Sequence, residues 1–168
     1  MTNDRDTGIS RRSVLGTLGA VVGVAAAAGA LTISMQRPAA AQTLGQQETV
    51  DEALKRLFAG RPLKDAGNLV KLDVPLIAEN GAAVKVEVEA TSPMTPANHV
   101  KYIYVVADKN RIPVVTRVAL SPESGQAYMA ANVRLGETGD VRAIVEQSDG
   151  TLLQVKREVK VTVGGCGG

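Results

Sequence analysis

The chain has 168 residues, with 19 Lys and Arg against 17 Asp and Glu, a formal net charge of +2, one Cys, one His and no Trp. A single cysteine excludes an internal disulfide. Aromatic residues make up 2% of the chain, which argues against a stacking platform for bases or sugar rings.

An arginine pair, Arg11 and Arg12, stands directly before a Gly- and Ala-rich apolar stretch from Val14 to Ile33. This order is typical of an export signal, and the small residues that follow predict cleavage after Ala41. The segment resembles a twin-arginine signal, with Val in the apolar position where Phe is usual. That resemblance implies export of the folded protein to the periplasm. A retained membrane anchor is the alternative, because about 20 apolar residues can span a bilayer.

The charge of the mature chain differs from that of the whole sequence. Residues 1–41, the predicted signal peptide, contain four of the arginines and two of the aspartates. Basic and acidic side chains are therefore equal in number in the rest. Phosphate binding needs a surplus of clustered Lys and Arg, so we expect no nucleic-acid partner. The mature chain also lacks a basic amphipathic helix for a membrane surface.

One amphipathic helix is predicted near the start of the mature chain, from Val50 to Ala59. Thr49 and Glu52 have the spacing of a capping box, in which the two side chains bind free amides of the first turn. Apolar residues follow at helical spacing, and Gly60 ends the element. The apolar stripe can cover the domain's own core, which we favour, or a second subunit.

From Leu69 onward, apolar residues alternate with polar ones, as in half-buried strands. The alternation is clearest from Val84 to Glu89, where every second residue is Val. Asn80-Gly81, directly before this run, predicts a tight hairpin turn, because both turn positions need a positive φ. The other predicted strands, separated by turn-forming clusters, are Leu69–Val74, Val100–Ala107, Ile112–Leu120, Ala127–Leu135, Val141–Gln147 and Leu152–Val163.

These strands predict a single β domain. Their connections are of hairpin length and contain no helices, whereas a parallel sheet needs long crossovers. We therefore predict a mainly β fold, an antiparallel immunoglobulin-like β-sandwich over residues 42–163 with a short N-terminal helix. The Cys and Trp residues typical of antibody domains are missing, so the prediction concerns the architecture alone.

Few residues are candidates for catalysis or metal binding. The sequence has no CxxC pair, no metal-spaced Cys and His cluster and no nucleophile elbow. We interpret His99, the single histidine, as a loop residue, and Glu87 and Glu89 as part of a solvated strand face. The sequence therefore predicts no catalytic residue, no metal site and no cofactor.

The single cysteine lies at the C-terminus. It is flanked by Gly164, Gly165, Gly167 and Gly168. Glycine removes both stiffness and bulk, so we predict a flexible arm over residues 164–168 that leaves the last strand at Val163. Three residues at about 3.3 Å each would carry Cys166 roughly 10 Å from the domain. No helix N-terminus or fixed cation adjoins the sulfur in the sequence, which predicts a reachable thiol that is not activated.

A reachable thiol in an exported chain has three interpretations. A carrier would hold its cargo covalently and present it to partner enzymes, which supply the catalysis. A structural β-sandwich would use Cys166 for an intermolecular disulfide. The same accessibility serves both, and the residues alone do not choose between them. An enzyme with Cys166 as nucleophile and His99 as base would need the two held together, which a glycine-rich segment disfavours.

The terminal Val163-Gly164-Gly165-Cys166-Gly167-Gly168, with the twin-arginine-like signal and the β-rich pattern, resembles the SoxY family. SoxY is the sulfur-carrier subunit of the bacterial thiosulfate-oxidising (Sox) multienzyme system. The resemblance implies a periplasmic carrier, itself not an enzyme, that holds thiosulfate-derived sulfur covalently on Cys166. It also implies a heterodimer with a SoxZ-like subunit. The implied enzyme partners are a c-type cytochrome, a manganese-dependent hydrolase and a sulfur dehydrogenase.

Overall fold

The computed structural model describes residues 45–165, and these belong to one compact unit. In chain order, their elements are α1 (Val50–Phe58), β1 (Leu63–Asp65), β2 (Val70–Asp73), β3 (Ile77–Asn80), β4 (Val84–Ala90), β5 (Val100–Ala107), β6 (Val114–Ala119), the 3-10 helix η1 (Pro122–Ser124), β7 (Ala127–Val133), β8 (Gly139–Gln147) and β9 (Leu152–Val163). The predicted helix and strands are all present, with ends that agree within two residues. The predicted signal peptide, with Arg11 and Arg12, lies outside the described residues.

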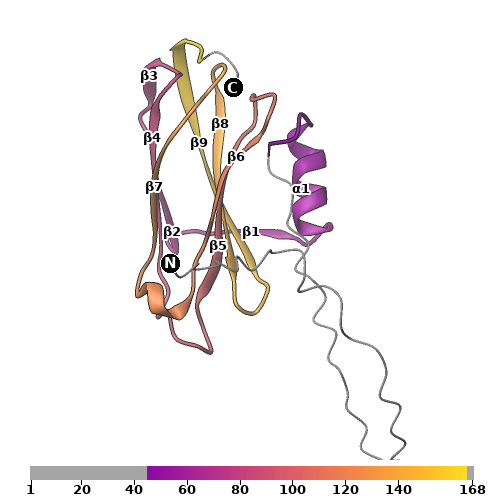
Figure 1. The fold of residues 1–168 in the computed structure, drawn as a ribbon, viewed down its shortest axis with the longest axis vertical. Helices are drawn as coiled ribbons and strands as arrows, with labels where there is room; N and C mark the ends of the chain where they lie inside the picture. The colour runs from indigo at the N-terminus through magenta and orange to yellow at the C-terminus, as the bar shows by residue number, and fades with distance from the viewer. Residues whose placement is uncertain (1–44, 166–168) are drawn as a thin grey trace, which may run out of the picture. The chain divides into compact units, whose positions relative to one another are not determined.

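Two sheets face each other across the core (Figure 1). The larger sheet has the strand order β1-β9-β8-β5-β6, with β3 beside β9, and the smaller sheet has the order β2-β4-β7. The long strands pair antiparallel, β5 with β6 and β8, β8 with β9, and β4 with β2 and β7. The predicted immunoglobulin-like β-sandwich is confirmed.

The sequence pattern of each strand decides which side chains enter the core. In β4, Val84, Val86 and Val88 are buried, whereas Lys85 between them is exposed. Strand β5 is instead buried on both faces from Ile103 onward. Its inner face packs in the core between the two sheets, and its outer face is covered by α1. A central strand with two covered faces therefore has a continuous apolar sequence.

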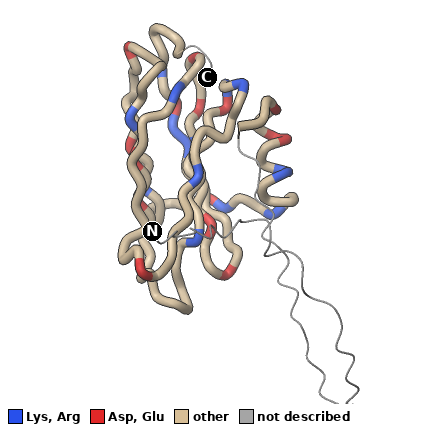
Figure 2. The backbone as a smooth tube through the Cα atoms, viewed as in Figure 1, with Lys and Arg blue, Asp and Glu red and all other residues tan. Residues whose placement is uncertain are grey.

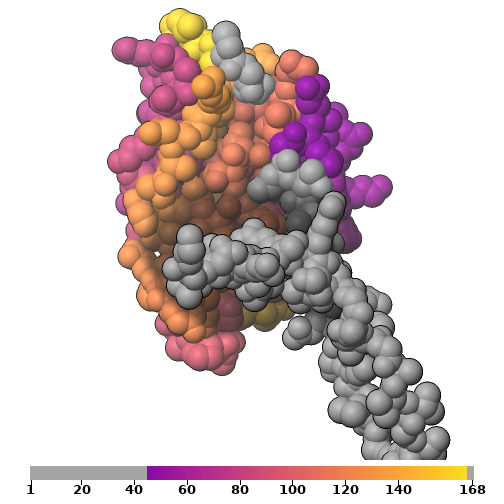
Figure 3. Space-filling model, in the orientation of Figure 1, coloured from indigo at the N-terminus to yellow at the C-terminus, as the bar shows by residue number. Residues whose placement is uncertain are grey.

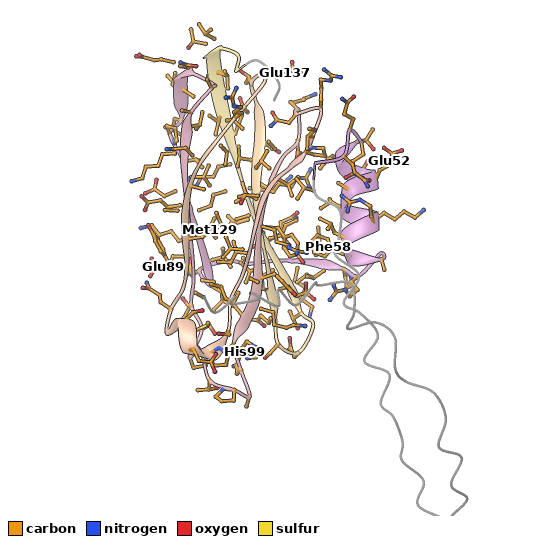
Figure 4. All side chains as sticks on the ribbon, viewed as in Figure 1. Glu52, Phe58, Glu89, His99, Met129 and Glu137 are labelled. Atoms are coloured by element: carbon orange, nitrogen blue, oxygen red, sulfur yellow. The ribbon has the colours of Figure 1, made fainter. Side chains whose placement is uncertain are left out.

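Helix α1 packs on the outer face of the larger sheet of its own chain (Figure 1). Thr49 and Glu52 form the predicted capping box, in which the Thr49 amide donates to the Glu52 carboxylate at 2.8 Å. Figure 4 shows Phe58 at the side of the helix that faces the sheet, where its ring meets that of Tyr104 edge-on, with centroids 5.1 Å apart. The apolar stripe of the helix therefore covers the chain's own core.

Two short strands that the sequence did not predict, β1 and β3, both pair parallel with β9. The hairpin predicted at Asn80-Gly81 is wrong, because β3 lies beside β9 whereas β4 belongs to the smaller sheet. Gly81 does not adopt a positive φ. Asn80 Oδ1 accepts a hydrogen bond from the Ala82 amide at 2.8 Å. The chain therefore passes from one sheet to the other at Gly81.

Figure 2 shows Lys and Arg interspersed with Asp and Glu along the strands and the helix. Several of these charges pair. Arg142 Nε donates to Asp108 Oδ1 at 2.6 Å, and Arg56 Nε donates to Glu48 Oε2 at 3.1 Å. Between residues 45 and 165, no helix has the length and hydrophobicity needed to cross a membrane.

Candidate functional site

The last strand, β9, ends at Val163, which pairs with Asn80 at the end of β3. Figure 3 shows the yellow end of β9 beside the magenta β3 region at the top of the view. Two residues beyond the strand, Gly164 and Gly165, are described. Cys166, Gly167 and Gly168 lie outside the described residues. The structure thus defines the candidate site up to the residue that precedes Cys166.

Three backbone hydrogen bonds join this end of β9 to two neighbouring loops. The Gly81 amide donates to the Val163 carbonyl at 2.7 Å. The Leu135 amide donates to the Gly81 carbonyl at 2.8 Å, and the Gly165 amide donates to the Leu135 carbonyl at 3.0 Å. Gly165 is buried in this arrangement. The β3–β4 turn, the β7–β8 loop and the residues after β9 therefore meet backbone to backbone.

Glycine is required at three positions here, because the backbones approach too closely for a side chain. A Cβ atom on Gly81 would lie 2.2 Å from the Leu135 carbonyl oxygen, and one on Gly164 would lie 2.2 Å from the Gly136 carbonyl oxygen. A Cβ atom on Gly165 would lie 2.6 Å from the Gly81 carbonyl oxygen. We name the backbones of Gly81, Leu135 and Gly136 the tail-binding cluster, since Gly164 and Gly165 pack against them.

The side chain of Asn110 holds the β7–β8 side of the tail-binding cluster. Its Nδ2 donates to the Arg134 carbonyl at 2.7 Å, and its Oδ1 accepts from the Gly136 amide at 2.9 Å. Asn110 is only 8% exposed, so its amide depends on these main-chain partners. These two hydrogen bonds hold the main chain on either side of Leu135, whose carbonyl accepts from the Gly165 amide.

The glycine-rich sequence predicts a flexible arm that begins directly after Val163. The structure differs, because Gly164 and Gly165 pack against the tail-binding cluster. At these two positions, the missing side chain permits close packing of the backbones. The prediction from the sequence instead attributed the glycines to flexibility and small bulk of the arm. Because Gly165 is held by the domain, the reach of Cys166 from the nearest held residue is at most one residue, about 3.5 Å, instead of roughly 10 Å.

Figure 4 shows His99 at the opposite end of the sandwich from Glu137, the residue that follows Gly136 of the tail-binding cluster. The His99 amide donates to Ser148 Oγ at 3.2 Å, in the loop from which β9 starts. Strand β9 has 12 residues, which span roughly 40 Å at about 3.3 Å each. The His99 Nδ1 lies 3.2 Å from the Thr95 carbonyl oxygen of its own loop. His99 is therefore a loop residue, as predicted, and cannot act as a base for Cys166 while Gly165 holds this position.

Glu87 and Glu89 lie on the outward face of the smaller sheet, in β4. Glu87 forms an ion pair with Lys85, whose hydrogen bond lowers the pKa of the carboxyl. Glu89 accepts from Gln126 Nε2 at 3.4 Å. Each carboxylate has its own partner, so the two do not form a catalytic pair. Over the described part of the chain, no group of three or more His, Cys, Asp or Glu side chains could hold a metal ion.

The sequence matches the family model for the sulfur oxidation protein SoxY over residues 54–166. This chain belongs to the SoxY family. The matched range covers most of the chain, from α1 through both sheets, and it extends to Cys166. No curated protein sequence matches.

Solved structures agree with the family and the fold. The sulfur carrier protein SoxY from Chlorobium limicola f thiosulfatophilum is 27% identical with a TM-score of 0.57, and the alignment covers 68% of this chain and 97% of that one. A superoxide reductase (neelaredoxin) from Ignicoccus hospitalis is 17% identical with a TM-score of 0.53, covering 61% and 96%. The second likeness concerns the fold alone.

Gly81, Leu135 and Asn110 were not predicted to belong to the site. Gly81 follows Asn80 in a pair typical of hairpin turns, and Asn110 ends a cluster of turn-forming residues. Their contacts with the C-terminal glycines are made by the main chain or through it. No local sequence signal distinguishes Gly81 and Asn110 from the residues of ordinary turns.

Proposed function

We propose that this chain is a periplasmic sulfur carrier that holds thiosulfate-derived sulfur covalently on Cys166 and presents it to partner enzymes. The observation that carries the proposal is the SoxY family match, which includes Cys166, the single cysteine of the chain. The similar protein from Chlorobium is described as a sulfur carrier. The packing of Gly165 against the domain adds support, since Gly165 directly precedes Cys166 in the chain.

Loading joins the Cys166 sulfur to the sulfane sulfur of thiosulfate. One sulfur–sulfur bond forms, the thiol proton passes to solvent, and two electrons are removed. A c-type cytochrome accepts these electrons in the proposed system. The thiolate is the reacting form of the cysteine, and the product is a cysteine S-thiosulfonate.

Hydrolysis then releases sulfate. Water attacks the terminal sulfonate sulfur, the bond between that sulfur and the sulfane sulfur breaks, and a persulfide remains on Cys166. No electrons are transferred in this step, which we assign to a manganese-dependent hydrolase. A sulfur dehydrogenase next oxidises the remaining persulfide sulfur, accepting the electrons while water supplies the oxygen. Cys166 remains covalently loaded from one enzyme to the next.

In this proposal, the chain itself is not an enzyme. A cysteine enzyme holds a base beside its nucleophile, whereas His99 lies beside Ser148, just before the start of β9, and Gly165 follows the other end of that 12-residue strand. The partner enzymes supply the metal, the oxidant and the proton transfers. We further propose a heterodimer with a SoxZ-like subunit, and export of the folded chain through the signal that contains Arg11 and Arg12.

Intact-mass analysis tests the proposal. The mature chain is purified from its native cells during growth on thiosulfate and measured before and after reduction. We expect thiosulfonate and persulfide adducts that a reductant removes and that are missing from Cys166→Ser. We also expect Cys166→Ser to stop thiosulfate oxidation. The proposal is wrong if the native chain yields only a reducible dimer and the Cys166→Ser cells oxidise thiosulfate normally, as a structural disulfide predicts.

A further inference from the structure

We propose that Gly81 and Asn110 are positioning residues for Cys166. They shape the tail-binding cluster, which holds the Gly164-Gly165 backbone and so fixes the residue from which the chain continues to Cys166. The two glycines before Cys166 thus have a docking role, because their backbones pack against the domain. The docking itself does not depend on the proposed function. Only its purpose, the positioning of Cys166 as a sulfur carrier, rests on that function.

The geometry of Gly81 supports the proposal. Its amide and carbonyl are both used, the first by Val163 and the second by Leu135, so its main chain bridges β9 and the β7–β8 loop. Its missing side chain leaves the space in which the Gly165 nitrogen lies, only 2.8 Å from the position of a Cβ atom. Any other residue at position 81 would displace the segment that leads to Cys166.

The geometry of Asn110 supports it independently. A buried side-chain amide is costly unless its donor and acceptor are both satisfied. Asn110 satisfies them on Arg134 and Gly136, and this fixes the direction of the Leu135 carbonyl between them. That carbonyl is the acceptor for the Gly165 amide. Asn110 therefore acts on the tail through Leu135 and does not touch the cysteine's substrate.

Docking has a consequence for the reach of the thiol. Gly165 contributes one hydrogen bond to the cluster, and one such bond changes a population by about fivefold. The docked and released forms can therefore exchange. Release of Gly164 and Gly165 adds two residues, or about 7 Å, to the reach of Cys166. A partner with a shallow site can use the docked form, whereas a deep channel requires the released form.

A pair of matched variants separates docking from flexibility. Gly164→Ala places a Cβ atom against the Gly136 carbonyl, whereas Gly167→Ala makes the same change on the other side of the cysteine. We expect Gly164→Ala to speed hydrogen exchange at the Gly165 amide by about fivefold, through loss of its hydrogen bond. Gly167→Ala is expected to leave that exchange rate unchanged. Equal effects of the two variants, or none from Gly164→Ala, would overturn the proposal.

The domain side of the contact is tested by Gly81→Ala and Asn110→Ala, with Asn132→Ala on the exposed face of β7 as control. The readout is exchange at the Gly165 amide, measured by NMR on the mature chain in variants whose circular dichroism is native. We expect both variants, but not the control, to speed this exchange by about fivefold. Unchanged exchange in a folded Gly81→Ala or Asn110→Ala protein would overturn the role of that residue. If either fails to fold, the Gly164→Ala comparison decides.

A thiol measurement shows whether docking limits reach. The alkylation rates of Cys166 by N-ethylmaleimide and by a maleimide on a short linker to a large carrier protein are compared as a ratio. We expect Gly164→Ala to raise the relative rate of the bulky reagent, because release extends the thiol from the domain. A change in thiol reactivity alone would alter both rates equally and contradict positioning. Neither the amide exchange nor the alkylation measurement uses sulfur transfer. Failure of the positioning proposal is therefore distinct from failure of the carrier function.

Discussion

The hydroxyl of Tyr104 in β5 donates a hydrogen bond to Glu146 Oε2 in β8 at 3.2 Å. The other carboxylate oxygen, Oε1, accepts from Arg61 at 3.0 Å, just beyond the end of α1. The three side chains therefore tie the helix to two central strands. Tyr104 is 1% exposed, and its burial, followed by the charge of Glu146, raises its pKa to about 12.

Alkaline pH is expected to weaken the fold through Tyr104. Folding favours the neutral phenol, because its pKa rises from 10.0 to about 12. This contribution is complete below the unfolded pKa and is lost as the pH rises through the folded value. Its upper limit is about 2.7 kcal/mol, at 1.36 kcal/mol for each pKa unit. Unfolding free energies measured from about pH 8 to about pH 12 should fall more steeply for the wild type than for Tyr104→Phe. Parallel curves would contradict this prediction.

Removal of the capping hydroxyl should destabilise α1. In Thr49→Ala, the Glu52 amide loses its side-chain acceptor, which lies 3.3 Å away. We expect the free energy of unfolding to fall by about 1 kcal/mol, measured by urea denaturation. Thr91→Ala is the control, since Thr91 is exposed and follows β4; it should change stability by less than about 0.5 kcal/mol. An equal effect of the two changes would mean that the cap does not stabilise the domain.

The packing of α1 on its own sheet predicts a large effect of Phe58→Ala. Phe58 is 2% exposed and packs with Tyr104, Ile144 and Leu152. Its truncation in the isolated chain should cost about 3–5 kcal/mol of unfolding free energy. Leu69→Ala, at a side chain that is 48% exposed, should cost less than about 0.5 kcal/mol. Unaltered stability of the isolated Phe58→Ala chain would show instead that the helix serves a partner subunit.

The twin-arginine interpretation predicts the export behaviour of the precursor. Replacement of Arg11 and Arg12 by Lys keeps the charge but removes the paired guanidinium groups. We expect the precursor to accumulate in the cytoplasm, as measured by cell fractionation and immunoblotting. Arg5→Lys, outside the pair, should be exported normally. Mass spectrometry of the exported chain should give Gln42 as its first residue, whereas an uncleaved chain in the membrane fraction would favour the retained anchor.

Most of the strands could be predicted because their burial follows a local pattern. The alternating valines of β4 and the continuous apolar sequence of β5 both reflect the surfaces that each strand meets. Strands β1 and β3 escaped prediction because they are three and four residues long. Their partner β9 lies far along the sequence, and no repeat or spacing in the sequence indicates that β1 and β3 pair parallel with it.

Asn80-Gly81 shows how a local signal can mislead. The pair is typical of a hairpin because both residues tolerate positive φ. Here the strands on either side join different sheets, and Gly81 is needed because the Leu135 carbonyl and the Gly165 amide come close to it. A glycine that is needed for close tertiary packing therefore looks the same in the sequence as a glycine that is needed for a turn.

The sequence alone determined that one cysteine stands between glycines at the chain end, that the body is a β-sandwich and that the chain resembles SoxY. These properties follow from residue identity and short-range periodicity. Only the tertiary structure decided that Gly164 and Gly165 are docked, since the contacts come from Gly81 and Leu135 in distant loops. Such contacts join main-chain atoms, which every residue carries, and therefore leave no side-chain pattern to read.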